Sequence, residues 1–244
     1  MGGLMSLDLL IFDFDGVLSN SEYLSSLSLV ETLGKLGLDL TLEEAERRFS
    51  GMGSQQMVTS LQQQDGLIVP EDFQAQNWAI VQRLMREQLQ PVRHVPEMLA
   101  ALPPDLPICI ASNSFKEWID FALEIMGLGH YFDESVRFNA DMVSRGKPAP
   151  DLHLHVLAEM GGIDPKRALV IEDTLTGLGG GIAAGIEVWG CTAVIPHPEQ
   201  RAQALLAAGA TRVFNDLRLL PAFVEERRQG LGSARHALIS AHDR

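Results

Sequence analysis

Four groups of polar residues in this sequence follow apolar segments, and together they could do chemistry at one site. The groups are Asp13 with Asp15, Ser112 with Asn113, Lys147, and Glu172 with Asp173. Two or more carboxylates can collect a hard cation such as Mg²⁺, which prefers oxygen ligands. One carboxylate can attack phosphorus as a covalent nucleophile, and a second, two residues further on, can move protons. A hydroxyl group and a lysine can hold the phosphoryl oxygens, where charge lies in the transition state.

Each group taken alone has an ordinary structural explanation. An Asp-x-Asp-Gly segment is typical of a solvated turn, and Ser-Asn after a strand is typical of a helix cap. A lysine before a proline is usually a surface residue, and an acidic pair often begins a helix. The occurrence of all four groups in this order, each at the end of an apolar segment, favours a single phosphoryl-transfer site.

These side chains can meet if the apolar segments are neighbouring parallel strands, because ligands of open parallel sheets bind beyond the carboxyl ends of the strands. The segments are short and continuously apolar, as expected of strands that are buried on both faces. Helical patterns alternate with them, which indicates an α/β fold with helices on both faces of a parallel sheet. We expect strands at residues 9–12, 108–111, 136–138, 168–171, 187–189 and 212–214.

The segment between the first and second strands has a different pattern. Its apolar residues recur at helical spacing, which predicts helices over residues 24–36 and 71–89. The capping box formed by Thr41 and Glu44 predicts the start of another helix. Because this block interrupts the sheet directly after its first strand, we expect it to form a second, inserted domain. The predicted domains are an α/β core of residues 1–17 and 91–244 and an all-helical insertion of residues 18–90.

Composition and charge exclude several classes of protein. The 244 residues are 46% hydrophobic and 21% charged, a globular balance that argues against a disordered chain. The formal net charge of −13 argues against a nucleic-acid partner and against a polybasic membrane anchor. A small anionic substrate remains compatible, since a bound metal reverses the field of an acidic pocket.

The cysteines and the N-terminal residues indicate the compartment. Cys109 and Cys191 lie in apolar runs, which predicts two reduced core thiols rather than a disulfide framework. The first residues have no cationic segment of a signal peptide, and no run reaches the roughly 20 apolar residues of a membrane span. We therefore expect a cytoplasmic protein.

Four segments of the sequence form a recognisable set. They are Asp13-Phe14-Asp15-Gly16-Val17-Leu18, Ala111-Ser112-Asn113-Ser114, Gly146-Lys147-Pro148-Ala149-Pro150-Asp151 and Ile171-Glu172-Asp173-Thr174-Leu175-Thr176-Gly177. With these segments, of which the first and third are highly specific as a pair, the sequence resembles the haloacid dehalogenase-like hydrolases across nearly its whole length. The resemblance implies a Rossmann-like core, a helical cap inserted after the first strand, and Mg²⁺ as the cofactor.

The resemblance implies roles for the acidic residues. Asp13 would be the nucleophile and a ligand of Mg²⁺. Asp15 would be the general acid and base, and its backbone carbonyl would bind the metal. Asp173, together with Glu172, would complete the metal site.

The remaining implied roles concern the substrate. Ser112, Asn113 and Lys147 would bind the phosphoryl group. The cap would supply contacts to the rest of the substrate, and closure of the cap would exclude bulk water. The cap residues expected to face the substrate are Glu22, Gly51 and Met52.

The chain departs from the family pattern in two places outside the expected catalytic residues. Ser19-Asn20-Ser21-Glu22 stands where the sugar-phosphatase branch often has Val-Asp-Ser-Glu. Gly179-Gly180-Gly181 replaces the alanines that are usual on the helix after the acidic pair. A glycine in a helix interior costs about 1 kcal/mol, so we expect this helix to be irregular or closely packed.

The histidines do not form a metal-binding pattern. His153 and His155 are two residues apart on a predicted helix, so their side chains diverge. We expect the histidines to lie at the surface or at helix caps.

These observations predict a Mg²⁺-dependent phosphatase of small phosphorylated metabolites, with sugar phosphates as the expected substrates. A β-phosphoglucomutase is one alternative, although residues 21–25 contain no histidine and residues 51–56 contain no arginine, where the mutases have them. A hydrolytic dehalogenase is a second alternative, but that branch typically lacks the second aspartate, Asp15. A non-catalytic metabolite-binding or regulatory protein is the third, and the intact set of catalytic residues argues against it.

Overall fold

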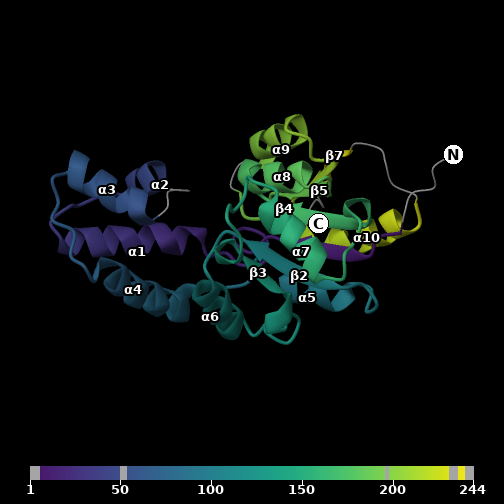
Figure 1. The fold of residues 1–244 in the computed structure, drawn as a ribbon, viewed down its shortest axis with the longest axis horizontal. Helices are drawn as coiled ribbons and strands as arrows, with labels where there is room; N and C mark the ends of the chain where they lie inside the picture. The colour runs from purple at the N-terminus through teal and green to yellow at the C-terminus, as the bar shows by residue number, and fades with distance from the viewer. Residues whose placement is uncertain (1–5, 50–53, 196–197, 231–235, 240–244) are drawn as a thin grey trace, which may run out of the picture. The chain divides into compact units, whose positions relative to one another are not determined.

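The computed structural model describes residues 6–49, 54–195, 198–230 and 236–239. Within these residues, seven parallel strands form one sheet in the order β3-β2-β1-β4-β5-β6-β7 (Figure 1). The six predicted strands are all present, whereas β7 was not expected from the sequence. The strands are β1 Leu9–Phe12, β2 Ile108–Ser112, β3 Arg137–Asn139, β4 Ala168–Glu172, β5 Glu187–Cys191, β6 Arg212–Phe214 and β7 His236–Ile239.

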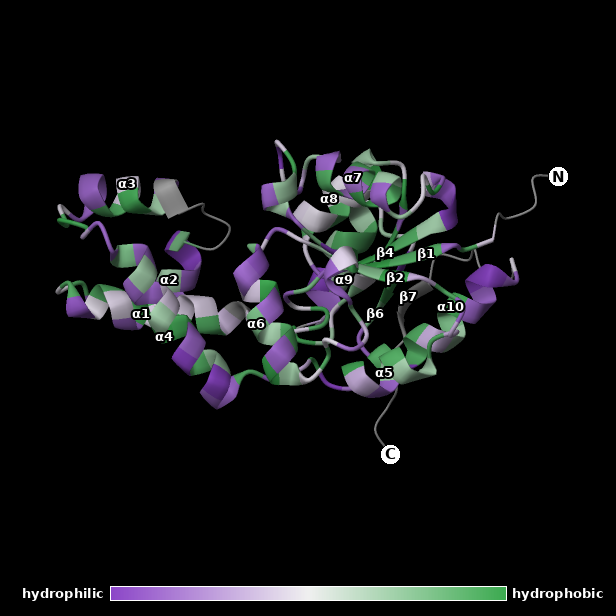
Figure 2. Ribbon diagram, turned by 60° about the horizontal axis from the view of Figure 1, so that its bottom comes forward, coloured by the Kyte–Doolittle hydropathy of each residue, from purple (hydrophilic) through white to green (hydrophobic). Residues whose placement is uncertain are grey.

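Helices cover both faces of this sheet, as predicted (Figure 2). The core under α7, α8 and α9 contains Leu9 and Ile11 of β1, and Phe12 points to the opposite face, where its ring meets Phe132 edge-on at 6.3 Å. Both faces of β1 are therefore buried, which explains its uninterrupted apolar sequence. The helices of this part are α5 Val95–Ala101, α6 Lys116–Met126, α7 Asp151–Glu159, α8 Leu175–Ala183, α9 Pro198–Ala207 and α10 Leu220–Arg228, with short 3₁₀ turns at Glu134–Val136, Ala140–Met142, Pro165–Arg167 and Leu217–Leu219.

The chain divides into two compact units, Met1–Asn20 with Gln90–Arg244 and Ser21–Leu89. The second unit contains four helices within the described residues and has an apolar core of its own, which includes Leu33, Leu61 and Phe73. The predicted capping box is present, since Glu44 accepts hydrogen bonds from the backbone and hydroxyl groups of Thr41 at 2.8 and 2.9 Å. The function of this unit as a cap stays a prediction. Its helices are α1 Glu22–Lys35, α2 Leu42–Phe49, α3 Ser54–Gln64 and α4 Phe73–Gln88.

The glycines of α8 allow this helix to pack closely on its neighbours. A Cβ atom on Gly180 would lie 3.2 Å from the carbonyl oxygen of Ala149, and one on Gly181 would lie 2.6 Å from Cγ2 of Val188. The helix is continuous from Leu175 to Ala183. Of the two alternatives that the sequence left open, close packing is therefore correct.

His153 corrects the prediction that the histidines lie at the surface or at caps. Its side chain is fully buried, and neither ring nitrogen has a hydrogen-bond partner among the described residues. Helix α7 buries Leu152, His153, Val156 and Leu157 toward the sheet, because positions i, i+1, i+4 and i+5 share one helix face. Desolvation, followed by the nearby charge of Lys147, lowers the pKa of His153 to about 4, so the ring is neutral at neutral pH.

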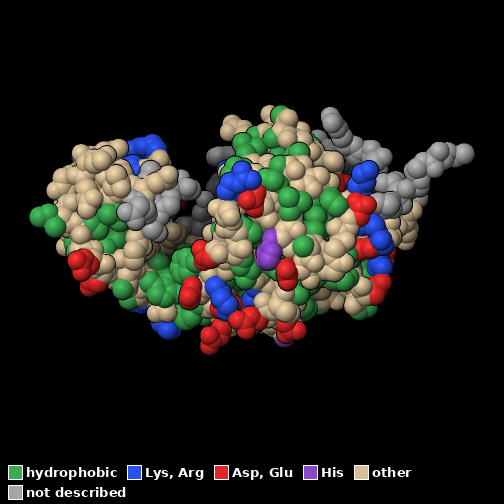
Figure 3. Space-filling view, viewed as in Figure 1, with side chains coloured by type: hydrophobic (Ala, Val, Ile, Leu, Met, Phe, Trp, Pro, Cys, Tyr) green, Lys and Arg blue, Asp and Glu red, His purple; other side chains and the backbone are tan. Residues whose placement is uncertain are grey.

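The surface of the α/β unit carries acidic and basic side chains side by side (Figure 3). Lys116 lies 2.5 Å from Asp120 and 2.8 Å from Glu134, for example, and Arg137 lies 2.7 Å from Asp120. Each exposed ion pair of this kind contributes about 0–1 kcal/mol to the stability of the fold. The burial of apolar side chains therefore contributes most of the stability. Cys109 and Cys191 belong to this buried interior as free thiols, as predicted. Among the described residues, no helix has the length and apolar character needed to cross a membrane.

Candidate active site

Pairing of β1 with β4 brings the first two acidic groups together. Phe12 of β1 is in register with Ile171 of β4, and the backbone N–H of Asp13 donates to the carbonyl oxygen of Ile171 at 3.0 Å. Asp13 and Glu172 therefore emerge next to each other at the carboxyl ends of neighbouring strands. The sequence predicted this meeting on the condition that the two strands are neighbours, and the pairing of β1 with β4 meets that condition.

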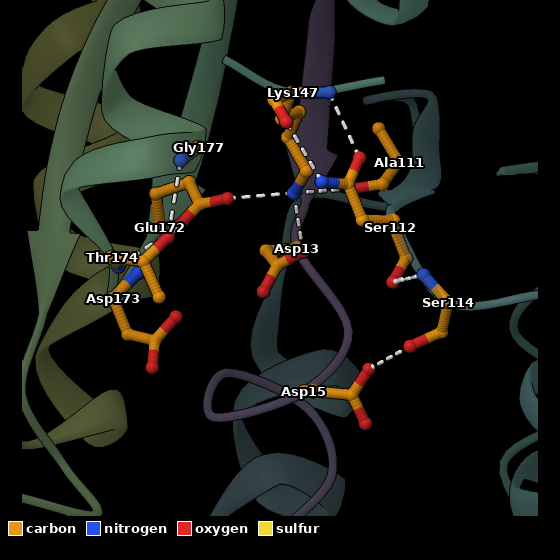
Figure 4. Close-up of polar contacts among 11 residues, drawn as sticks. Asp13, Asp15, Ala111, Ser112, Ser114, Lys147, Glu172, Asp173, Thr174 and Gly177 are labelled. Atoms are coloured by element: carbon orange, nitrogen blue, oxygen red, sulfur yellow. Dashed lines mark hydrogen bonds and ion pairs between the residues drawn. The ribbon is translucent and has the colours of Figure 1, made fainter. Parts of the chain in front are cut away.

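Lys147 joins these two carboxylates from a loop between β3 and α7 (Figure 4). The expectation that Lys147 directly follows an apolar strand is therefore wrong, because β3 ends eight residues earlier, at Asn139. Its Nζ atom donates to Oδ1 of Asp13 at 2.5 Å, to Oε1 of Glu172 at 2.7 Å and to the carbonyl oxygen of Ala111 at 3.0 Å. The side chain is only 4% exposed, so all three donors of the ammonium are used inside the protein. This geometry fixes one lysine directly beside the predicted nucleophile.

The three charged groups of this cluster, Asp13, Glu172 and Lys147, have pKa values that are shifted in different directions. Burial, together with the charge of Glu172, raises the pKa of Asp13 to about 8. Burial acts in the same direction on Glu172, but Lys147 and the hydrogen bonds from Thr174 hold the pKa of Glu172 below its usual value. Burial alone would lower the pKa of Lys147, yet Asp13 and Glu172 outweigh it and raise that pKa. The ammonium contacts both carboxylates, and the neighbouring negative charge of Glu172 makes ionisation of Asp13 less favourable.

The excess negative charge of this cluster would be neutralised by a divalent cation. Asp13, Glu172 and Asp173 each offer an oxygen atom, and these atoms lie within 4.8 Å of one another. Three carboxylates and the ammonium of Lys147 leave an excess of two negative charges when all are ionised. Gly16 makes room for this arrangement, because a Cβ atom there would lie 2.1 Å from Oδ2 of Asp173. A compact set of buried carboxylate oxygens is the donor chemistry that Mg²⁺ prefers.

Glu172 is held by hydrogen bonds on both carboxylate oxygens. Its Oε2 atom accepts from the backbone N–H groups of Asp173 and Thr174 and from the hydroxyl group of Thr174, each at 3.0 Å. Thr174 also caps helix α8, since its hydroxyl oxygen accepts from the N–H of Gly177 at 3.0 Å. Sequence reasoning gave Thr174 no role, although a threonine before a helix is a recognised capping signal.

The two phosphate-binding residues predicted at the end of β2 differ in placement. Ser112 is buried, and its hydroxyl oxygen accepts from the N–H of Ser114 at 3.0 Å. The Asn113 amide instead pairs with the backbone of Lys147: its Nδ2 donates to the carbonyl oxygen, and its Oδ1 accepts from the N–H, both at 2.9 Å. Asn113 therefore holds the loop that carries the lysine. Its predicted contact with phosphate stays a prediction.

Asp15 lies two residues beyond Asp13, and its carboxylate points toward the segment after β2 (Figure 4). Oδ2 accepts from the hydroxyl group of Ser114 at 2.5 Å, and Oδ1 accepts from the indole N–H of Trp118 at 2.9 Å. Neither donor was predicted from the sequence: the apolar pattern predicts a helix over residues 115–126, in which Trp118 is one apolar residue, and Ser114 directly precedes it. The part that the Asp15 backbone carbonyl would have in metal binding stays a prediction.

The predicted substrate contacts of the helical unit lie largely outside the described residues. Gly51 and Met52 belong to the segment 50–53, which the structure does not describe. Glu22 is the first residue of α1, but its side chain is not described either. These contacts stay predictions.

Comparison with known proteins decides the family. Residues 10–191 match the family described as haloacid dehalogenase-like hydrolase, which is more than half of the chain. The chain belongs to the haloacid dehalogenase-like hydrolases. The matched range contains Asp13, Lys147 and Asp173, so the cluster described above lies within the part of this hydrolase that defines its family.

Several curated relatives of this hydrolase are named as phosphatases. The 6-phosphogluconate phosphatase of Escherichia coli is 26% identical over 75% of this chain and 81% of its own. The phosphorylated carbohydrates phosphatase of Thermotoga maritima is 27% identical over 88% of this chain and 97% of its own. The family and these named activities support the prediction that this hydrolase acts on phosphoric monoesters.

Solved structures of the family have the same fold. A family hydrolase from Deinococcus radiodurans, which was crystallised with bound phosphate and sodium, is 32% identical to this chain. The two align with a TM-score of 0.73, covering 94% of this chain and 99% of the other. The predicted Rossmann-like core with a helical insertion is therefore confirmed as the fold of this hydrolase.

Proposed function

We propose that this hydrolase is a Mg²⁺-dependent phosphatase of small phosphorylated metabolites, in particular sugar phosphates, and that it acts through an aspartyl-phosphate at Asp13. The observation that carries the proposal is the buried ammonium of Lys147, which contacts Asp13 at 2.5 Å and Glu172 at 2.7 Å at the end of β1. A nucleophilic carboxylate beside a fixed cation suits attack on an anionic ester. The relatives that act on 6-phosphogluconate and on phosphorylated carbohydrates support the substrate class.

The first half of the proposed reaction forms a covalent intermediate. A carboxylate oxygen of Asp13 attacks phosphorus while the bond between phosphorus and the ester oxygen breaks. Asp15 transfers its proton to the departing oxygen, so the alcohol leaves as a neutral molecule. Lys147 would exchange its hydrogen bond to Asp13 for one to a phosphoryl oxygen, and the hydroxyl group of Ser112 would bind another. Negative charge lies on these oxygens during transfer.

The second half returns the enzyme to its starting state. Water attacks phosphorus and gives a proton to Asp15, while the bond between phosphorus and Asp13 breaks and inorganic phosphate leaves. Asp13, Glu172 and Asp173, with the backbone carbonyl of Asp15, are the groups proposed to hold Mg²⁺. When bound there, Mg²⁺ would supply the positive charge that draws the anionic substrate to the carboxylates.

The helical unit is proposed to determine which ester is accepted. It would contribute Glu22, Gly51 and Met52 and would exclude water on closure. This proposal rests on the insertion of residues 18–90 directly after the strand that carries Asp13.

A turnover screen tests the proposal directly. We expect Mg²⁺-dependent release of inorganic phosphate from a panel of sugar phosphates, abolition by a chelator, and restoration by added Mg²⁺. Asp13→Asn should be inactive and should trap no phosphoryl-enzyme. Asp8→Asn is the matched control, since Asp8 lies just before the opposite end of β1, where it pairs with Arg167.

The alternatives predict different products. A mutase would convert β-glucose 1-phosphate, with a trace of the bisphosphate, to glucose 6-phosphate with little release of phosphate. A dehalogenase would release halide from a 2-haloacid without added metal. Full activity of Asp13→Asn, or of the wild type in chelator, would contradict the proposed mechanism.

A further inference from the structure

The orientation of Asp15 is fixed by two donors that come from a distant part of the sequence. Ser114 donates to Oδ2 at 2.5 Å, and Trp118 donates to Oδ1 at 2.9 Å. The two carboxylate oxygens thus have different donors, on a segment about 100 residues further along the chain. A carboxylate that is held at both oxygens has little freedom to rotate about its last torsion angle.

Both donors are themselves held rigidly. Trp118 lies in the first turn of α6, is 6% exposed, and contacts Phe115 edge-on at a ring distance of 6.1 Å. The N–H of Ser114 donates to the hydroxyl oxygen of Ser112, which ties the segment to the end of β2. The position of Asp15 is therefore coupled to the same strand end that carries the predicted phosphate-binding serine.

A purely structural role would explain Trp118 but not Ser114. A buried indole N–H needs an acceptor, and Trp189 meets this need away from the site by donating to Glu187 at 2.9 Å. A serine hydroxyl adds almost no packing, so its bond to Asp15 has no comparable structural reason. The convergence of two donors on one half-buried carboxylate indicates that the carboxylate is the group being positioned.

We propose that Ser114 and Trp118 are positioning residues that orient Asp15 for proton transfer to the leaving group. This inference rests on the role proposed above for Asp15. Proton transfer requires the carboxyl group to lie within hydrogen-bond reach of the ester oxygen, so small changes in its orientation reduce the rate. The two residues would act through Asp15, to which both donate hydrogen bonds.

The loss of rate caused by a misoriented Asp15 depends on the leaving group of the substrate. p-Nitrophenolate leaves without protonation because p-nitrophenol is a much stronger acid than phenol. Phenyl phosphate has the same ring and nearly the same shape, but its leaving group needs the proton. Comparison of the two esters isolates proton transfer, since recognition of the ring is common to both.

The test measures kcat/KM, which reports the steps up to formation of the phosphoryl-enzyme, for both esters with Mg²⁺ present. We expect Trp118→Phe and Ser114→Ala each to lower kcat/KM for phenyl phosphate about 10-fold or more. For p-nitrophenyl phosphate, the change should stay within about twofold. Trp189→Phe, which also removes a buried indole donor from a carboxylate, should leave the ratio of the two values as in the wild type.

Asp15→Asn separates failure of this inference from failure of the proposed function. Asp15→Asn should change the ratio more than either positioning variant, and Trp118→Phe added to Asp15→Asn should have no further effect on it. If Asp15→Asn changes the ratio but Ser114→Ala and Trp118→Phe do not, the positioning inference is wrong and the proposed function stands. If Asp15→Asn itself leaves the ratio unchanged, the role proposed for Asp15 is wrong. Ser114→Ala keeps the test decisive should Trp118→Phe lower the thermal stability.

Discussion

A Cβ atom on Gly177 would lie 1.5 Å from Oε1 of Glu172, which is the oxygen that accepts a hydrogen bond from Lys147. No side chain can occupy that space, so the helix after β4 can begin beside this carboxylate only with glycine at residue 177. Thr174 completes the arrangement by bonding both to Glu172 and to the N–H of Gly177. The start of α8 and the charge cluster thus form one packed unit.

Gly177→Ala should reduce activity strongly. The added methyl group forces Glu172 away from Lys147, and displacements of about 1 Å at such a site cost on the order of 10²-fold in rate. Gly179→Ala is the matched control, because its Cβ atom would be 3.5 Å from Pro148, an ordinary contact. Alanine also favours the helix by about 1 kcal/mol, so Gly179→Ala should keep kcat/KM and raise the melting temperature. Equal kcat/KM for the two variants would contradict this account.

Asn113→Ala should weaken the site through the loop that carries Lys147. It removes two hydrogen bonds at 2.9 Å to the backbone of that lysine, and kcat/KM should fall about 10-fold. Asn215→Ala, at the end of β6, serves as the control and should stay within about twofold of the wild type. Wild-type kcat/KM in Asn113→Ala would show that the loop is held without Asn113.

Magnesium should stabilise the protein independently of turnover. A cation that binds the folded state at 100 times its Kd adds about 2.7 kcal/mol of stability, which raises the melting temperature by several degrees. Asp173→Asn removes one of the three clustered carboxylates and should abolish this shift. Asp15→Asn should retain it, because that carboxylate is engaged by Ser114 and Trp118. A shift that persists in Asp173→Asn, measured by thermal unfolding with and without Mg²⁺, would place the cation elsewhere.

The stability of the protein should fall below neutral pH because of His153. Its pKa is lowered from 6.5 to about 4 in the folded state, so the unfolded chain takes up the proton first as the pH decreases. The stability linked to the neutral form of His153 is fully present above pH 6.5 and is lost as the pH falls toward 4. The free energy of unfolding should therefore decrease by about 2 kcal/mol between pH 7 and pH 5. His153→Leu should remove this part of the pH dependence and should not destabilise the protein at pH 7, since it removes an unpaired buried polar group. Urea unfolding at the two pH values measures both effects, and an unchanged difference between them would rule out His153 as the cause.

The sequence predicted the strands of the core because each depends on a local pattern, and it predicted that Asp13 and Glu172 would meet only if their strands were neighbours. A continuous apolar run predicts a strand buried on both faces, and the polar residue after it then lies at the carboxyl end. Pairing of β1 with β2 on one side and β4 on the other brings the ends together. The residues from about Glu225 onward have mixed charge and no clear period, which is why β7 was missed.

His153 shows where local patterns were insufficient. A histidine on a helix is polar by type, and only the packing of α7 against the sheet decides that this one is buried. The same holds for the glycines of α8, whose number suggested either irregularity or close packing. The distance of a Cβ atom on Gly181 from Val188 decides for close packing, and no spacing in the sequence contains that distance.

The sequence by itself determined which residues carry the charges: Asp13, Lys147 and the acidic pair at the end of β4 are evident from residue type and position. The tertiary structure alone decided how they are held. Asn113 forms a hydrogen bond with the backbone of Lys147, 34 positions away, and Trp118 donates to the carboxylate of Asp15, 103 positions away. Contacts of this kind depend on the packing of segments that are remote in the chain, and a hydrogen bond needs its two atoms placed to within a few tenths of an ångström. Composition and spacing specify the segments, whereas that placement follows from the packed fold.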